Sequence, residues 1–255
     1  MTGPLRARTE EEQMTMQVST AADPGHQTCS GGNLPKEQAM VSRPISRASE
    51  RLCSLCGGTG WQPAGTEDSR YRRCECVKAR IIAIRLGVIP ELFRGASFEG
   101  YKARNPQQER AVALMKSLPE GNWYMTGPYG SGKTHLFYAQ YRVLAAAGKI
   151  LCHVRTTREL LEEFRRRELD CMDISPVMAA AHSSEPYHLF WDDIDKIKPT
   201  DFKAEVLFEL VDALYRRKHG LTITANYSLQ DLVARERMHP AIVRRLDDMC
   251  KVIQL

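Results

Sequence analysis

Short apolar runs separated by longer amphipathic segments occupy the chain from about residue 106 to its end. The runs are rich in aromatic and β-branched residues, and the segments between them repeat apolar residues every three or four positions. Strands that alternate with helices in this way are typical of parallel βαβ units. We therefore predict an α/β fold with a five-stranded parallel sheet flanked by helices, the strands covering residues 123–125, 149–154, 187–193, 221–226 and 251–255.

Capping residues and prolines mark the expected helices. A short basic helix is predicted over residues 78–86, ending at Gly87, and another over residues 105–117. Thr156 and Glu159 have the spacing of a capping box, in which each side chain bonds the backbone N–H of the other residue. Later helices are expected to start near residues 200, 228 and 240.

The first 49 residues differ from the rest in composition. They are rich in Thr, Gly, Pro, Ser, Gln and Glu and hold few large apolar residues, so burial cannot offset the entropy lost on ordering. We predict a disordered tail over residues 1–49. The remainder divides into a small cysteine module (50–80), a linker with the basic helix and packing anchors (81–105), and the α/β domain (106–255).

A glycine-rich loop joins the first predicted strand of the sheet to the next helix. It fits the pattern G-x-x-x-x-G-K-[ST]. Glycines let successive backbone N–H groups point toward phosphate oxygens, and the helix N-terminus adds positive potential. A turn that merely caps a helix is the alternative, but it needs neither the Lys nor the Thr. We predict that a nucleoside triphosphate binds to Gly127, Pro128, Tyr129, Gly130, Ser131, Gly132, Lys133, Thr134 and His135.

Two acids end the third predicted strand. Asp192, together with Thr134, can hold the Mg²⁺ of a bound triphosphate, and Asp193 can orient or deprotonate the attacking water. Asn226 ends the next strand, where its amide can contact the γ-phosphate or position that water. An Asp-rich turn that includes Asp195, with ordinary turn chemistry at Asn226, is the alternative. With the loop present, the pattern predicts an NTPase.

Four cysteines in two pairs precede the α/β domain. Cys53 and Cys56 form the first pair, and Cys74 and Cys76 form the second. Four thiolates close a tetrahedral zinc site, and so small a segment would gain folding energy from the metal. The alternatives are reduced cysteines without a metal, or a redox pair. We predict a structural Zn²⁺, and no catalysis there, because such a site keeps no open position.

Composition narrows the class of protein. The chain has 255 residues, eight cysteines, 43% hydrophobic residues, a formal net charge of +5 and an isoelectric point of about 8.8. This small excess of positive charge is compatible with binding to nucleic acid, but it is weak evidence for such binding on its own. No apolar run reaches the ~18 residues of a membrane span, and the N-terminus does not look like a secretory signal. We expect a cytoplasmic protein without a membrane partner.

The order of these motifs resembles the DnaC/DnaI/IstB group of AAA+ ATPases, which are bacterial and phage helicase loaders and transposition helpers. The resemblance covers about residues 50–255. It includes the cysteine pairs, Gly-Pro-Tyr-Gly-Ser-Gly-Lys-Thr, Phe-Trp-Asp-Asp, Thr-Ala-Asn-Tyr-Ser and Arg-Arg-Leu. It implies that the loop is Walker A, that Asp192 and Asp193 are Walker B, and that Asn226 is sensor 1. Arg245 matches the arginine finger, which reaches a neighbouring subunit's γ-phosphate, and Arg244 is its rival.

The resemblance implies an ATP-regulated replication protein that binds single-stranded DNA and a replicative helicase and forms an ATP-dependent homo-oligomer. We expect Mg²⁺-dependent ATP hydrolysis to be slow, because Asp193 stands where many AAA+ proteins carry Glu. No helical lid or sensor 2 arginine follows the fifth strand, which favours a switch over a motor. A transposition helper that acts with a transposase, and a nucleotide-bound adaptor that does not hydrolyse ATP, remain alternatives.

Basic residues on two predicted helices are candidates for contacts with single-stranded DNA. A solvated helix face or a basic helix C-terminus explains them as well. The candidates are Arg158, Arg165, Arg166, Arg216, Arg217 and Lys218. In the linker, Phe93 and Phe98 either pack near the base of the nucleotide or anchor the core.

Overall fold

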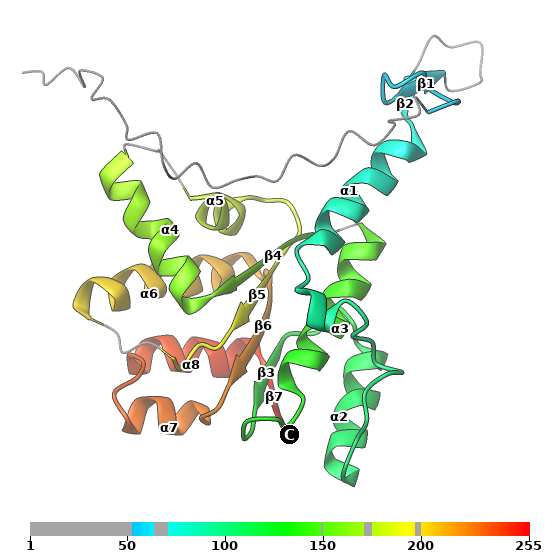
Figure 1. Ribbon diagram of the computed structural model, residues 1–255. Helices are drawn as coiled ribbons and strands as arrows, with labels where there is room; N and C mark the ends of the chain where they lie inside the picture. Colours follow the sequence, from blue (N-terminus) through cyan, green and yellow to red (C-terminus); the bar gives the residue numbers. More distant parts are fainter. Residues whose placement is uncertain (1–52, 64–70, 149, 171–174, 197–199) are drawn as a thin grey trace, which may run out of the picture. The chain divides into compact units, whose positions relative to one another are not determined.

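The computed structural model describes residues 53–63, 71–148, 150–170, 175–196 and 200–255 (Figure 1). All described residues belong to one compact unit, Leu52–Leu255. The tail predicted over residues 1–49 therefore lies outside the described residues. Within them, no helix combines the length and the apolar character that a membrane crossing requires.

A parallel sheet organises this unit. Its strand order is β4–β5–β6–β3–β7, and every neighbouring pair is parallel. The strands are β3 (Trp123–Thr126), β4 (Leu151–Thr156), β5 (Tyr187–Asp192), β6 (Gly220–Ala225) and β7 (Lys251–Gln254). β3, β5 and β6 are buried almost throughout, as expected of strands covered on both faces. The predicted five-stranded α/β fold is confirmed.

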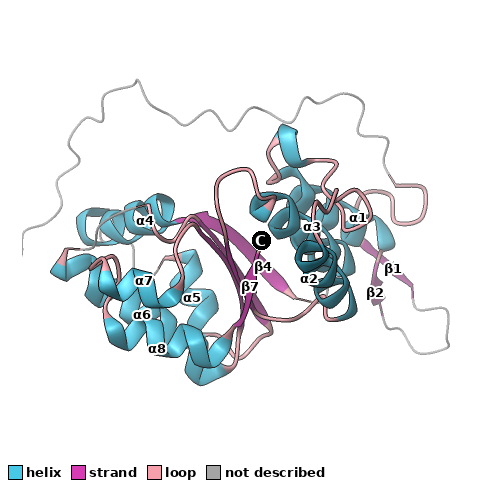
Figure 2. Cartoon of the chain, turned by 90° about the horizontal axis from the view of Figure 1, so that it is seen from below, coloured by secondary structure: helices cyan, strands magenta, loops and turns pink. Residues whose placement is uncertain are grey.

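Helices cover both faces of the sheet (Figure 2). One face carries α2 (Pro106–Ser117) and α3 (Lys133–Ala147), and the other carries α4 (Thr157–Asp170), α5 (Pro176–His182), α6 (Asp201–Arg217), α7 (Leu229–Ala234) and α8 (Pro240–Met249). Trp123 and Met125 of β3 join the core beneath α3, whereas Tyr124 joins the core beneath α6 and α8. This alternation follows from the two-residue period of a strand.

Side-chain caps define helix starts that the sequence predicts. The Asn105 side chain accepts a hydrogen bond from Gln108 N at 2.9 Å at the start of α2. Thr156 N donates to Glu159 Oε2 at 2.7 Å, and Glu159 N donates to Thr156 Oγ1 at 3.2 Å. The expected capping box is thus present at α4. The sequence prediction missed α5, because seven residues span barely two turns and show no clear periodicity.

The segment before the sheet begins with the cysteine module. β1 (Trp61–Pro63) and β2 (Tyr71–Arg73) form an antiparallel hairpin, followed by α1 (Glu75–Gly87) and the 3₁₀ turn η2 (Glu91–Phe93). α1 packs on α3, where Tyr141 Oη donates to Arg85 O at 2.9 Å. Arg85 Nη1 in turn donates to Ile150 O at 3.2 Å, just before β4.

Both linker phenylalanines serve as packing anchors. Phe98 is buried in the core beneath α3. Phe93 packs against the same core and stacks on Tyr138 of α3, with 5.2 Å between ring centroids. Of the two roles considered for these rings, anchoring the core is the one that the structure shows.

Candidate nucleotide-binding site

The loop between β3 and α3 has a backbone that requires glycine. The φ angle is +76° at Gly130 and +95° at Gly132, values that other residues rarely adopt. A Cβ on Gly132 would lie 2.5 Å from the ring of Tyr101, and one on Gly127 would lie 2.3 Å from the carbonyl oxygen of Leu255. Because α3 begins at Lys133, the positive end of its dipole lies at this loop.

Lys133 folds back into the loop. It is 7% exposed, and its Nζ donates to the carbonyl oxygens of Gly127 at 2.7 Å and of Pro128 at 2.9 Å. Burial lowers the pKa of Lys133, and Asp193, Asp195 and Asp192, which lie at the end of β5 and just after it, oppose this shift. The negative charge of these acids favours the ammonium form of Lys133, whereas its hydrogen-bond partners are neutral carbonyls. Phosphate oxygens would make stronger, charge-assisted hydrogen bonds in their place.

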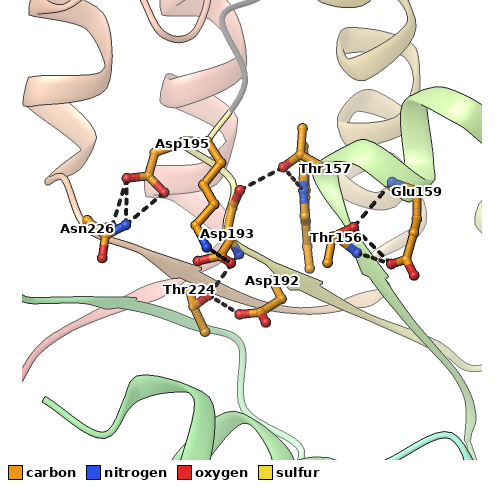
Figure 3. A network of polar contacts seen from close by, with 10 residues as sticks. Thr156, Thr157, Glu159, Asp192, Asp193, Asp195, Thr224 and Asn226 are labelled. Atoms are coloured by element: carbon orange, nitrogen blue, oxygen red, sulfur yellow. Dashed lines mark hydrogen bonds and ion pairs between the residues drawn. The ribbon is translucent and has the colours of Figure 1, made fainter. Parts of the chain in front are cut away.

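Asp192 is held by the neighbouring strand β6 (Figure 3). Thr224 Oγ1 donates to Asp192 Oδ1 and accepts a hydrogen bond from Asp193 N at 2.9 Å. Burial raises the pKa of Asp192, and the hydrogen bond from Thr224 opposes that rise. One hydroxyl group thus orients the carboxylate and opposes part of the pKa rise that burial causes.

Asp193 occupies a strained position beside it. Its φ angle is +56°, a conformation that Asp tolerates better than most residues. Thr157 Oγ1 donates to Asp193 O at 2.9 Å, which ties this loop to the start of α4. The carboxylate of Asp193 pairs with Lys196 Nζ at 2.5 Å. To accept a proton from water, Asp193 would have to release Lys196.

Asn226 is anchored by an acid that the sequence pattern assigned only to a turn. Asp195 Oδ2 accepts hydrogen bonds from Asn226 N at 3.0 Å and from Asn226 Nδ2 at 3.2 Å (Figure 3). Asp195 is only 3% exposed. Its role and that of Thr224 depend on contacts between neighbouring strands, so the sequence alone carried no signal for either.

Comparisons with known proteins give matches in structure only. No protein-family model matches the sequence, and no curated protein does. The DnaC helicase loader matches with a TM-score of 0.53 and 22% identity, over 65% of this chain and 99% of that chain. DnaI matches with a TM-score of 0.53 and 17% identity, over 66% and 91%. The chain has the AAA+ fold of the DnaC helicase loader.

The same AAA+ fold occurs in the replication initiator DnaA bound to AMPPCP and single-stranded DNA. That match has a TM-score of 0.54 and 16% identity, over 65% of this chain and 51% of that chain. The present chain thus spans about half the length of DnaA. In the sheet described above, the residues expected to form Walker A, Walker B and sensor 1 lie at or just after the ends of three adjacent strands, β3, β5 and β6.

The other predicted residues of the Walker A loop differ in their surroundings. Thr134 is half-buried in the first turn of α3, and Tyr129 is 81% exposed. Ser131 Oγ is buried and has no hydrogen-bond partner among the described residues, as fits a loop that receives phosphate oxygens. His135 faces the linker: its Nε2 lies 2.9 Å from Ser97 O, and its ring contacts Tyr101 edge-on.

A cavity of about 240 Å³ lies between the Walker A loop and the linker. The loop side is lined by Gly130, Ser131, Gly132 and His135, and the linker side by Gly100, Tyr101, Lys102 and Arg104. Tyr101 Oη donates to Ser131 O at 2.7 Å, which joins the two sides. Neither Phe93 nor Phe98 is among the residues that line it. The sequence pattern gave no indication of Tyr101, Lys102 or Arg104.

The two candidates for the arginine finger lie on α8. Arg245 donates to Asp212 of α6 at 2.9 Å through Nε and at 2.8 Å through Nη2. Its guanidinium also lies 4.4 Å from the ring centre of Phe208. Arg244 is exposed. In this single chain Arg245 is held by an intramolecular ion pair, whereas Arg244 projects into solvent.

The four cysteines converge as the zinc prediction requires. All four Sγ atoms lie within 4.8 Å of one another. The Cys53–Cys74 and Cys56–Cys76 sulfur distances are 3.7 and 3.5 Å. A regular tetrahedron with Zn–S bonds of ~2.3 Å places sulfurs ~3.8 Å apart, so the residues fit a zinc ion.

The electrostatics of the cysteine cluster also fit a cation. A hydrogen bond from the backbone of Gly60 lowers the pKa of Cys56 to about 7. Hydrogen bonds with the thiols of Cys74 and Cys56 raise the pKa of Cys76 to about 12. Thiols this close resist losing all four protons unless a positive ion compensates the negative charge.

The predicted DNA-contacting residues lie on two helices. Arg158 and Arg165 are exposed on α4, and the side chain of Arg166 lies outside the described residues. Arg216 pairs with Asp212 at 2.6 Å, on the helix that also supplies the partner of Arg245. Arg217 and Lys218 are exposed at the end of α6.

Proposed function

We propose that this chain is a Mg²⁺-dependent AAA+ ATPase that acts as a switch in DNA replication. The observation that carries the proposal is the fixed arrangement at the ends of β3, β5 and β6. There a buried lysine in a glycine loop, an acid held by Thr224 and an amide held by Asp195 lie at or just after the ends of three neighbouring strands. Similarity to the DnaC helicase loader and to DnaA bound to AMPPCP supports this class of activity.

Each residue of the site has its own role in ATP hydrolysis. Lys133 exchanges its bonds with the Gly127 and Pro128 carbonyls for bonds with phosphate oxygens. Thr134 and Asp192 hold Mg²⁺, which neutralises developing charge on the phosphates when it is bound. Asp193 orients the attacking water and accepts its proton after releasing Lys196. This extra step, together with the short side chain, makes slow turnover the expected behaviour.

The rest of the nucleotide binds near the linker. The cavity beside Tyr101 adjoins the Walker A loop and has room for the ribose and base of ATP. Lys102 and Arg104 provide cations there. Asn226, aimed by Asp195, completes the site by contacting the γ-phosphate or the water.

The proposed partners are single-stranded DNA and a replicative helicase, with an ATP-dependent homo-oligomer as the working form. The similarity to DnaC and to DnaA bound to single-stranded DNA supports this set. In the oligomer, Arg244 or Arg245 reaches the neighbouring site; for Arg245 this requires release from Asp212. The cysteine module (50–80) is a structural zinc unit, the linker (81–105) joins it to the ATP-binding domain (106–255), and the protein works in the cytoplasm.

Steady-state ATP hydrolysis tests the proposal. The wild-type chain should hydrolyse ATP slowly, faster with single-stranded DNA, and Lys133→Ala should abolish turnover. Lys116→Ala is a matched control, because Lys116 lies on α2 and pairs with Glu99 at the surface. Equal rates for wild type and Lys133→Ala would show that the site is not an ATPase.

The ion pair between Asp193 and Lys196 supports one alternative, a nucleotide-bound adaptor that does not hydrolyse ATP. If the pair persists when ATP binds, no base is available. The adaptor then binds ATP tightly without turnover, and Asp193→Ala leaves its cellular function intact. Loss of function in Asp193→Ala, with ATP binding retained, favours the ATPase.

A further inference from the structure

One face of the β1–β2 hairpin gathers aromatic side chains and an arginine. The hairpin pairs Trp61 with Arg73, and Pro63 with Tyr71. Directly opposed residues share a face, as do residues two apart on one strand. Trp61, Pro63, Tyr71 and Arg73 therefore lie on the same face, which we call the aromatic face. Gln62 and Arg72 lie on the other.

The aromatic face is open to solvent. Trp61 is 50% exposed and Tyr71 is 69% exposed, and Pro63 and Arg73 are exposed as well. Among its described residues, the cysteine module buries Cys56 and Cys74 and leaves these rings in water. Two large neighbouring aromatics that remain in water on so small a module indicate a binding surface.

The charge around the aromatic face favours a polyanion. The described residues of the module and α1 (53–63 and 71–87) contain five cations and a single carboxylate, Glu75. The guanidinium of Arg73 lies 5.8 Å from the ring centre of Trp61. Among the described residues, no carboxylate forms an ion pair with Arg72 or Arg73. On the aromatic face, Arg73 is the cation that a phosphate group can contact.

We propose that the aromatic face binds single-stranded DNA. Unpaired bases stack on the rings of Trp61 and Tyr71, while Arg73 contacts a backbone phosphate. This pairing of aromatic rings with cations is how proteins hold single strands without reading sequence. The bases of duplex DNA cannot stack on these rings, because they are already stacked on one another. The inference rests on the single-stranded DNA partner of the proposed function and gives that partner a docking surface outside the ATP-binding domain.

Tryptophan fluorescence can monitor this face directly. The chain has three tryptophans, and Trp123 and Trp191 are 0% exposed. Tryptophan emission at long wavelength, and its quenching by acrylamide, therefore report on the exposed Trp61. In the full-length, zinc-loaded protein without nucleotide, oligo(dT) should quench this emission and protect it from acrylamide, whereas a duplex should do neither. Trp61→Phe should lack the signal and still bind the oligonucleotide.

Fluorescence anisotropy with labelled oligo(dT) measures the contribution of each group. Trp61→Ala or Tyr71→Ala should weaken binding by about 5- to 150-fold, the range for losing one stacked base. Trp61→Phe keeps a ring and should stay close to wild type. Leu55→Ala is the matched control, since Leu55 is 65% exposed on the same module but is not part of the hairpin. Zinc content should be unchanged in every variant.

Salt dependence separates the arginines from the rings. Each phosphate contact contributes a slope of about 0.7 to the plot of log affinity against log salt for a single strand. Arg73→Ala should therefore reduce the slope by about 0.7, whereas Tyr71→Ala, and Arg72→Ala on the opposite face, should leave it unchanged. Equal slopes for wild type and Arg73→Ala would overturn the phosphate contact.

The outcomes also separate this inference from the proposed function. If oligo(dT) leaves Trp61 emission unchanged, and Trp61→Ala binds it like wild type, the aromatic face is not a DNA site. ATP turnover stimulated by single-stranded DNA would then still support the proposed function. Conversely, quenching at Trp61 in a protein that does not bind ATP would support the aromatic face and refute the ATPase.

Discussion

Thr224 connects the two acids of the site, and Thr224→Val removes that connection with little change in shape. The residue is 1% exposed. Its hydroxyl donates to Asp192 and accepts from Asp193 N. A lost hydrogen bond to a charged group costs about 1.5–3 kcal/mol, and an unpaired buried N–H costs about 1–3 kcal/mol. Allowing for relaxation, the free energy of unfolding should fall by roughly 2–4 kcal/mol.

The functional effect of this variant should exceed its structural effect. The hydrogen bond from Thr224 opposes the rise in the pKa of Asp192 that burial causes, so its loss should raise that pKa further. A partner of a metal-binding carboxylate typically contributes about 10- to 100-fold to metal affinity or activity. We therefore expect the Mg²⁺ concentration for half-maximal ATP hydrolysis to rise, or kcat/KM to fall, by about that factor.

Thr222→Val is the matched control on the same strand. Thr222 is 0% exposed and also makes two hydrogen bonds, with His188 Nε2 and with Gln140 Oε1, both at 2.8 Å. Both variants should unfold at lower urea concentration than wild type, but only Thr224→Val should change the Mg²⁺ dependence. Identical Mg²⁺ titrations for the two variants would refute the role of Thr224 in aiming Asp192.

Three further predictions concern other parts of the chain. Asp195→Ala frees the Asn226 side chain, so kcat should fall about 10- to 100-fold while KM for ATP changes little; a change in KM alone would contradict this. Burial lowers the pKa of His188 to about 3, so below about pH 6.5 the unfolded chain binds more protons and stability falls. Urea titrations should show that His188→Gln reduces the pH dependence of the free energy of unfolding by roughly 1.4 kcal/mol per pH unit. The same pH dependence in wild type and variant would exclude this role of His188. Cys76→Ala should abolish zinc binding, measured by metal analysis, and leave ATP affinity unchanged; retained zinc would contradict the four-thiolate site.

The fold was predictable because its signals are local. Apolar runs such as the one ending in Trp191 are buried on both faces, so they appear as continuous strands in the sequence. The glycine loop was equally readable, since Gly132 satisfies a backbone angle and a close approach that no other residue fits. The helix α5 was missed because Pro176–His182 is too short for a periodic pattern.

The fine structure of the site was not predictable, because it depends on contacts between distant parts of the chain. Thr224 reaches acids 31 and 32 positions away, and Arg245 pairs with Asp212 at a separation of 33. A single sequence carries no signal for such contacts. The linker residue Tyr101 was missed for the same reason, as its place over the Walker A loop depends on tertiary packing.

Titration calorimetry with ATP tests the central claim most directly. The claim is that the glycine loop around Lys133 holds a triphosphate whose metal is bound by Asp192. Wild-type protein titrated with ATP in the presence of Mg²⁺ should release a saturable heat of binding, with one nucleotide per chain. Lys133→Ala should show no such heat, and Asp192→Asn should bind equally with and without Mg²⁺. Absence of binding heat in the folded wild-type protein would contradict the account.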